Sequence, residues 1–228
     1  MPEALFVVTN VEQVRGFPKA TGFDIREAAS VWSELKKIGY NISFASLLGG
    51  PANGVLKGQI TDSVAAFIHG FSENMAVPTS TVKSRLDHHY DLIYFVGGLG
   101  CMWDFPYKDD LHQLIRHALI RKTRIAAICH GPAAFVGLAD SLGTAFTANR
   151  HVTGFSDAEE VSRGVMDLLP FSLQQALTES GARYSAAPDG HSHVVVDRGL
   201  VTAQNPASLP ELCTTLTTQP VILERTAR

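Results

Sequence analysis

The stretch that decides the fold runs from Arg124 to Pro132 and reads RIAAICHGP. The apolar residues after Arg124 predict a short strand that is buried on both faces. Gly131 permits a tight turn, and Pro132 is compatible with the first turn of a helix. Cys129 therefore stands between a strand and a predicted helix, on a sharp turn that projects its side chain outward.

Strands and helices alternate on both sides of this stretch. Apolar, β-branched or alternating runs predict further strands, and apolar residues at helical spacing predict helices. The predicted strands are 5–9, 41–46, 91–96, 183–187, 193–197 and 200–204, and the predicted helices are 24–39, 111–119, the Ala-rich run after Pro132, 158–168, 171–180 and one from Ser208. Residues 49–58 are predicted to form a loop, and residues 60–90 give no clear pattern.

The alternation predicts an α/β fold with a doubly wound, mostly parallel sheet and helices on both faces. Asp197-Arg198-Gly199 predicts a turn that makes the last two strands a small antiparallel pair. Because the connections are short, we expect residues 1–228 to form a single domain.

Composition limits the classes of partner. The chain has 228 residues, with 19 Lys and Arg against 22 Asp and Glu, a net charge of −3 that argues against nucleic acid. No apolar run is long enough for a membrane span, and the N-terminus lacks a secretory pattern. Three cysteines make no disulfide framework. We expect a cytoplasmic protein with free thiols.

Cys129 is the first candidate for chemistry. A helix N-terminus beside its sulfur would favour the thiolate, the form that attacks carbonyl carbon. The alternative is a small buried residue that ends a strand. His130 could move protons near neutral pH, or could lie on the surface. Glu27 is explained locally as a carboxylate in a first helical turn, and only a contact with Cys129 would make it catalytic.

A glycine-rich loop, Gly97-Gly98-Leu99-Gly100, follows the strand at 91–96. It matches a dinucleotide-binding loop poorly, because Trp103 stands where the third glycine should be. We therefore predict no nicotinamide or flavin site, and interpret the loop as a cradle of backbone amides for an oxyanion. The pairs His88-His89 and His191-Ser192-His193 do not complete a ligand set, so no metal site is predicted.

Five stretches together resemble the DJ-1/PfpI superfamily, most closely its Hsp31-like branch, described as glyoxalase III. AAICHGPAA at 126–134 is similar to the nucleophile segment. TGF at 21–23 with Glu27, GLGCMWDFP at 98–106, TGFSD at 153–157 with Glu159 and Glu160, and LVTAQNPAS at 200–208 are similar to other segments of that family in the same order.

The resemblance implies a flavodoxin-like α/β sandwich, usually a homodimer. It implies Cys129 as nucleophile, His130 as its acid/base neighbour and Glu27 as a carboxyl that handles a proton. Glu160 would orient the histidine, with Glu159 as the competing choice. The implied activity is that of a glutathione-independent, cofactor-free lyase of the D-lactate dehydratase type, which converts a small ketoaldehyde, methylglyoxal, to lactate. The pocket would include Gly98, Leu99, Gly100 and Gly131.

Leu99 departs from the family pattern, because Hsp31-like members commonly have histidine between these two glycines. Leucine cannot transfer a proton, which leaves the substrate open. Two alternatives follow: a related cysteine hydrolase or hydratase with another electrophile, and a non-catalytic redox sensor or holdase stress chaperone. Cys101 is a small filler or a redox partner that forms a disulfide with oxidised Cys129. Cys213 is expected to pack on a late helix.

Overall fold

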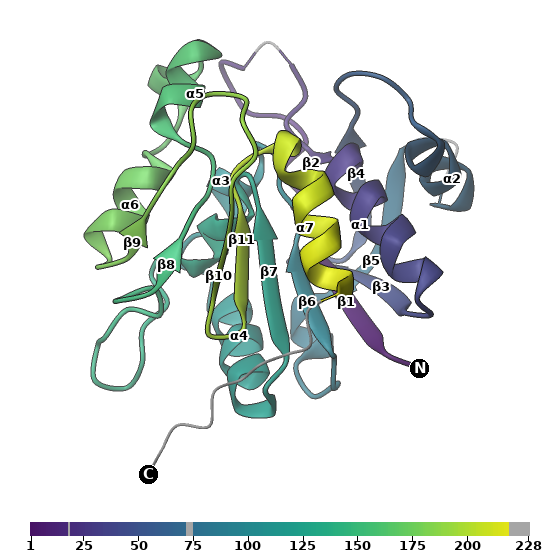
Figure 1. Ribbon diagram of the computed structural model, residues 1–228, viewed down its shortest axis with the longest axis horizontal. Helices are drawn as coiled ribbons and strands as arrows, with labels where there is room; N and C mark the ends of the chain where they lie inside the picture. Colours follow the sequence, from purple (N-terminus) through teal and green to yellow (C-terminus); the bar gives the residue numbers. More distant parts are fainter. Residues whose placement is uncertain (18, 72–74, 219–228) are drawn as a thin grey trace.

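A computed structural model describes residues 1–17, 19–71 and 75–218. Within these residues, nine strands form one sheet between two layers of helices (Figure 1). In spatial order the strands are β10 (Val194–Asp197), β11 (Leu200–Ala203), β7 (Arg124–Ile128), β6 (Leu92–Phe95), β1 (Glu3–Val7), β3 (Asn41–Ser46), β5 (Ala76–Thr81), β4 (Gly50–Val55) and β2 (Phe23–Asp24). A separate pair, β8 (His151–Val152) and β9 (Arg183–Tyr184), flanks the sheet.

The pairing is parallel except at β10–β11 and β4–β5. This confirms the predicted mostly parallel, flavodoxin-like sheet with a small antiparallel pair late in the chain. The turn at Arg198 and Gly199 joins that pair with φ angles of 48° and 81°. The second antiparallel pair corrects the predicted loop at 49–58, because Gly50–Val55 pairs with β5 as strand β4. Two glycines and a proline hid its strand pattern.

Two helical layers cover the sheet. One contains α1 (Ile25–Lys37), α2 (Asp62–Phe71) and α7 (Leu209–Thr218), and α1 and α7 lie side by side in Figure 1. The other contains α3 (Cys101–Asp104), α4 (Asp109–Arg121) and α6 (Leu173–Glu179). The short helix α5 (Asp157–Ser162) and the 3₁₀ turns η1 (Val82–Arg85), η2 (Gly131–Phe135), η3 (Met166–Leu168) and η4 (Pro206–Ser208) complete the chain.

Alternate residues of the central strands feed two separate cores. On β7, Ala126 and Ile128 pack with α1 and α7 in a first core, whereas Ile125 and Ala127 pack with α4 in a second core. All five residues of β7 are buried. This two-sided burial is the physical reason that the strand is continuously apolar after Arg124.

Two helix predictions need correction. The Ala-rich run after Pro132 forms only the 3₁₀ turn η2, because Val136 is extended and Gly137 has a φ of +83°. Ser208, the predicted cap of the last helix, instead ends the 3₁₀ turn η4, which Asn205 caps by accepting from the Ser208 amide at 3.2 Å, and the Ser208 hydroxyl bonds to His193 and Asn205. Within the part of the chain that the structure describes, no helix has the length and apolar character to span a membrane.

Candidate active site

Cys129 follows β7 directly and has a φ of 58°, a left-handed conformation that costs a non-glycine residue energy. Its neighbours hold this conformation in place. The Cys129 amide donates to the Ala203 carbonyl at 2.9 Å, and its own carbonyl accepts from the Phe155 amide at 2.8 Å. The side chain is 5% exposed. The predicted sharp turn is therefore present, and strands β7 and β11 fix the position of the sulfur.

His130 lies between the sulfur and a carboxyl group. Its Nδ1 is 3.2 Å from the Cys129 Sγ, and its Nε2 is 2.7 Å from the Glu160 Oε1. The imidazole stacks on the ring of Phe155, with centroids 4.8 Å apart. His130 and Glu160 are both buried. The histidine is thus oriented from two sides and faces the thiol.

Glu159 has a different set of partners. Its carboxylate completes a capping box with Ser156 at the start of α5 and accepts from Gln204 at 2.9 Å and Asn205 at 2.7 Å. Of these two glutamates, it is therefore Glu160 that contacts His130. Glu159 instead connects α5 to the segment after β11.

Glu27 lies in the first turn of α1, as predicted, and is fully buried there. It lies opposite Cys129 across Gly97. A Cβ placed on Gly97 would be 2.3 Å from the Glu27 Oε2 and 2.7 Å from the Cys129 Cβ. Neither carboxyl oxygen has a well-aligned hydrogen-bond partner among the described residues. The fold, rather than helical periodicity, brings this carboxyl to the thiol.

Burial raises the pKa of Glu27 well above its usual value, and the nearby Asp24 raises it further. The Cys129 thiol, Arg26 and Lys57 oppose this shift. Burial is also the main cause that raises the pKa of the Cys129 thiol. The charge of Glu27 raises this pKa further, and the charge of Arg163 lowers it. This corrects the expectation of a thiolate stabilised by a helix N-terminus. Only one 3₁₀ turn follows Cys129, so little dipole is available.

A cavity of about 60 Å³ opens beside this group of side chains. It is lined by Asp24, Lys57, Gly98, Leu99, Cys129, His130, Glu160, Arg163, Val165 and Pro206. A larger groove of about 370 Å³ between α1 and α7 contains Cys213. Burial raises the pKa of that thiol to about 11, and the residues that line the groove include no histidine. We therefore place the candidate site at the smaller cavity.

The glycine loop supplies backbone donors to this cavity. Gly98 has a φ of +135°, and a Cβ there would lie 2.4 Å from the Gly22 carbonyl, so only glycine fits. Within the described residues, the amides of Gly98, Leu99 and His130 have no hydrogen-bond acceptor. The predicted role of Gly100 as a donor needs correction, because its amide already donates to the Thr21 carbonyl at 2.8 Å.

Gly131 also lies away from the cavity. A Cβ on it would be 2.4 Å from the Phe95 carbonyl, so it lets η2 approach β6 closely. Cys101 is fully buried in the second core, and its sulfur donates to the Val96 carbonyl at 3.4 Å. Cys129 belongs to the first core on the other face of the sheet. This separation favours the packing alternative for Cys101 over the redox-partner alternative.

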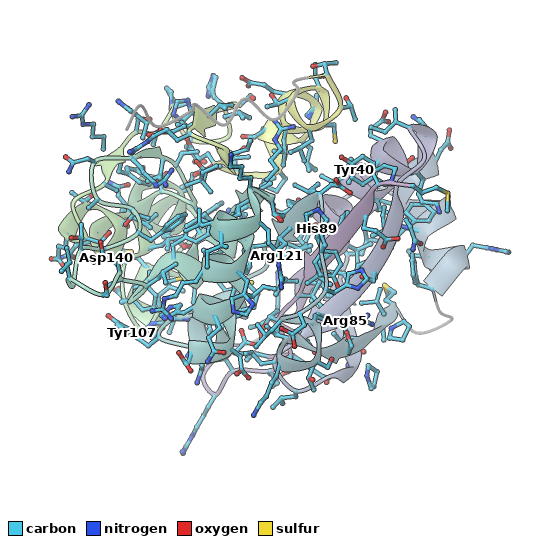
Figure 2. All side chains as sticks on the ribbon, turned by 90° about the horizontal axis from the view of Figure 1, so that it is seen from below. Tyr40, Arg85, His89, Tyr107, Arg121 and Asp140 are labelled. Atoms are coloured by element: carbon cyan, nitrogen blue, oxygen red, sulfur yellow. The ribbon has the colours of Figure 1, made fainter. Side chains whose placement is uncertain are left out.

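The predicted histidine pairs do not meet at the site. His193 lies 2.9 Å from the Ser185 hydroxyl, and His89 lies at the end of the sheet where the strands begin, viewed from below in Figure 2. Among residues 1–17, 19–71 and 75–218, no three His, Cys, Asp or Glu side chains are grouped to hold a metal ion.

Comparison with known proteins shows which family has this arrangement of residues. The sequence pattern of the DJ-1/PfpI family matches residues 17–219. The chain belongs to the DJ-1/PfpI family. The glutathione-independent glyoxalase HSP31 of Saccharomyces cerevisiae is 28% identical to it over 201 residues, 82% of this chain and 84% of the relative.

Two solved structures extend the likeness to the fold. Glyoxalase III from Candida albicans superimposes with a TM-score of 0.80 at 27% identity, covering 94% of this chain and 95% of that one. The 24-kDa Rapid Encystment Protein of Francisella tularensis gives 0.85 at 30% identity, covering 95% and 98%. Similar proteins of the DJ-1/PfpI family thus include named glyoxalases.

The sequence analysis missed several residues of this DJ-1/PfpI site, among them Lys57, Phe155 and Arg163. Lys57 lies in a segment without clear periodicity, and Phe155 gave no signal beyond its place in the TGFSD block. Arg163 is four residues after Glu159, a spacing that predicts an ion pair on a helix surface. That spacing would have misled, since Glu159 turns inward to Gln204 and Asn205.

Proposed function

We propose that this protein is a cofactor-independent, glutathione-independent glyoxalase that converts methylglyoxal to lactate. The single observation that carries the proposal is the position of the Cys129 thiol, which lies between the His130–Glu160 pair and the buried Glu27 in one small cavity. Relatives named glutathione-independent glyoxalase support the same reaction.

The first step depends on one proton shared by two acids. The raised pKa of Glu27 lets its carboxyl hold the proton of the Cys129 thiol, so that the sulfur becomes a thiolate as the carboxyl is neutralised. The thiolate attacks the aldehyde carbon and forms a hemithioacetal. The free amides of Gly98, Leu99 and His130 stabilise the oxyanion, which then takes up a proton.

The second step moves a hydrogen within the substrate. A base removes the proton from the former aldehyde carbon to give an enediol, and the proton returns at the adjacent carbon. Glu27 and His130 are the two acid–base groups in reach of the sulfur, and we assign the transfer to them. The product is a thioester of a 2-hydroxy acid on Cys129. Water then cleaves the thioester, which releases lactate and restores the thiol.

Lactate formation from methylglyoxal, without glutathione and with a metal chelator present, tests this function. We expect activity in the wild type and none above background in Cys129→Ala. Equal activity in the two proteins would overturn the assignment of the nucleophile.

Leu99 supports a second candidate, a hydrolase or hydratase that uses the same thiol. It lines the cavity and presents no titratable group at the wall where Hsp31-like proteins commonly have histidine. A panel of glyoxals, amides, isocyanides and small peptides separates the two candidates. Turnover of an amide or isocyanide with no lactate from methylglyoxal would favour the second.

A further inference from the structure

Two cations at the cavity form no ion pair among the described residues. Lys57 and Arg163 both line it and are both exposed. Among the described residues, neither side chain makes an ion pair or a hydrogen bond. The carboxylates nearby are already engaged, because Asp24 pairs with Arg26 at 2.8 Å and Glu160 with His130. The N–H donors of Lys57 and Arg163 are therefore free to bind a ligand at the mouth of the cavity.

Arg163 is held by an aromatic ring rather than by an acid. Its guanidinium carbon lies 4.3 Å from the centroid of Phe155, the same ring that stacks on His130. A cation over an aromatic face is oriented but keeps its charge and its N–H donors. Because His130 contacts both Phe155 and Cys129, this places a preorganised anion-binding group close to the nucleophile.

Part of the cavity wall is apolar. Leu99 and Val165 line the cavity together with Pro206. A short carbon chain fits such a wall, whereas a second polar group in the middle of the substrate would be left without partners. A guanidinium beside an ammonium favours a carboxylate at the far end of that chain.

We propose that the preferred substrates are small 2-oxoaldehydes that carry a carboxylate, with Cys129 at the aldehyde and Arg163 and Lys57 at the carboxylate. This specificity rests on the glyoxalase function proposed above. The reaction remains balanced in the same way: an oxoaldehyde acid and one water give a 2-hydroxy diacid, with no external oxidant or reductant.

Alkylation of Cys129 tests the anion site without any turnover. 5-Iodo-4-oxopentanoate and its methyl ester have the carbon skeleton of the proposed substrate and differ by one negative charge at its far end, and both form a thioether on the sulfur with loss of iodide. We would measure the rate of each at Cys129 by mass spectrometry and take the ratio of the two. Any effect of Arg163 on the thiolate cancels in this ratio, because both reagents react with the same sulfur.

The expected ratio of the rate for the iodo acid to the rate for its methyl ester in the wild type exceeds that of a free thiol in solution, and falls about tenfold in Arg163→Gln, as loss of one charge-assisted contact predicts. Lys57→Gln should lower it less, because the Lys57 side chain has no fixed contact. Lys36→Gln is the matched control, since it removes an exposed positive charge at the far end of α1. A ratio unchanged in Arg163→Gln would overturn the proposal.

The second test compares the turnover of two substrates. The substrates are 4,5-dioxopentanoate and its methyl ester, which differ only in the charge at the far end. We expect kcat/KM about tenfold higher for the acid than for the ester in the wild type, and a ratio near one in Arg163→Gln. An equal ratio in both proteins would contradict the specificity. A preference for the iodo acid over its ester, with no turnover of either dioxo compound, would support the anion site and overturn the glyoxalase function instead.

Discussion

At the scale of single residues, the buried carboxyl of Glu27 is unfavourable for stability. A carboxyl that is 0% exposed and lacks a well-aligned partner among the described residues costs free energy whenever it must ionise. Such a group persists because it acts on the neighbouring thiol. Function and stability should therefore respond to its removal in opposite directions.

We predict that Glu27→Gln abolishes lactate formation and raises Tm by about 2–4 °C, the shift that roughly 1 kcal/mol gives in a domain of this size. The pKa of Glu27 is raised in the folded state, so between its unfolded and folded pKa folding requires uptake of a proton and stability falls as pH rises. Below the unfolded pKa both states hold the proton. The gain in Tm should therefore be larger at pH 8 than at pH 4.

Thermal unfolding at the two pH values checks this prediction. Glu34→Gln is the matched control, because Glu34 is on the same helix but pairs with Lys37 at the surface. A gain in Tm that is equal at both pH values, or equal in the control, would show that the pKa of Glu27 is not raised in the folded protein.

The second prediction for a single residue concerns Gly97, which separates Glu27 from Cys129. Gly97→Ala should destabilise the protein by roughly 1–3 kcal/mol and remove activity, because its Cβ would meet Glu27, Cys129 and the Ile128 carbonyl, 2.6 Å away. The control is Gly70→Ala near the end of α2, where no atom lies within 4 Å, and stability should rise slightly. Urea unfolding with an activity assay compares them. Full activity in Gly97→Ala would contradict the contact between acid and thiol.

At the scale of elements, the two adjacent acids of α5 have separate tasks. Glu159→Ala should lower Tm, because the side-chain amides of Gln204 and Asn205 each lose one of their two acceptors in a buried position. Glu160→Gln should change Tm little but lower kcat, because it removes the carboxylate that orients His130. Melting curves and steady-state kinetics on both variants separate the roles. The reverse pattern would show that Glu159 is the positioning residue.

The sequence predicted the elements whose patterns depend on local geometry and burial. The apolar run of β7, the helical spacing of α1 and the turn at Arg198 all appear as expected. Strand β4 was missed because pairing with β5, not its own residues, makes it a strand. The η2 turn was taken for a helix because alanines favour helix while Gly137 ends it.

The candidate site was predictable only where motif and turn coincide. Cys129 and His130 were found from their position after a buried strand. The contact of Glu27 with the thiol and the choice of Glu160 over Glu159 came from resemblance alone, since residues far apart in sequence meet through the fold. Gly100 and Cys101 were considered for the site because they follow Gly98 and Leu99 in sequence. Neighbours in sequence need not face the same side, and both residues point away from the cavity contacts.

At the scale of the whole molecule, the sheet separates the thiols. Cys129 lies in the first core, and Cys101 lies in the second. We predict that mild peroxide oxidises Cys129 without forming a disulfide between them. Peptide mapping under non-reducing conditions checks this, with Cys101→Ala as the control variant. A Cys101–Cys129 cross-link in the folded protein would contradict the separation of the two cores.

The central claim is that Cys129 forms a covalent thioester during turnover. Acid quenching during conversion of methylglyoxal, followed by peptide mass spectrometry, tests it most directly. We predict one adduct of methylglyoxal mass on the peptide that contains Cys129, released by hydroxylamine as the hydroxamate of lactate and absent in Glu27→Gln. Steady lactate formation with no such adduct on Cys129 would contradict the account.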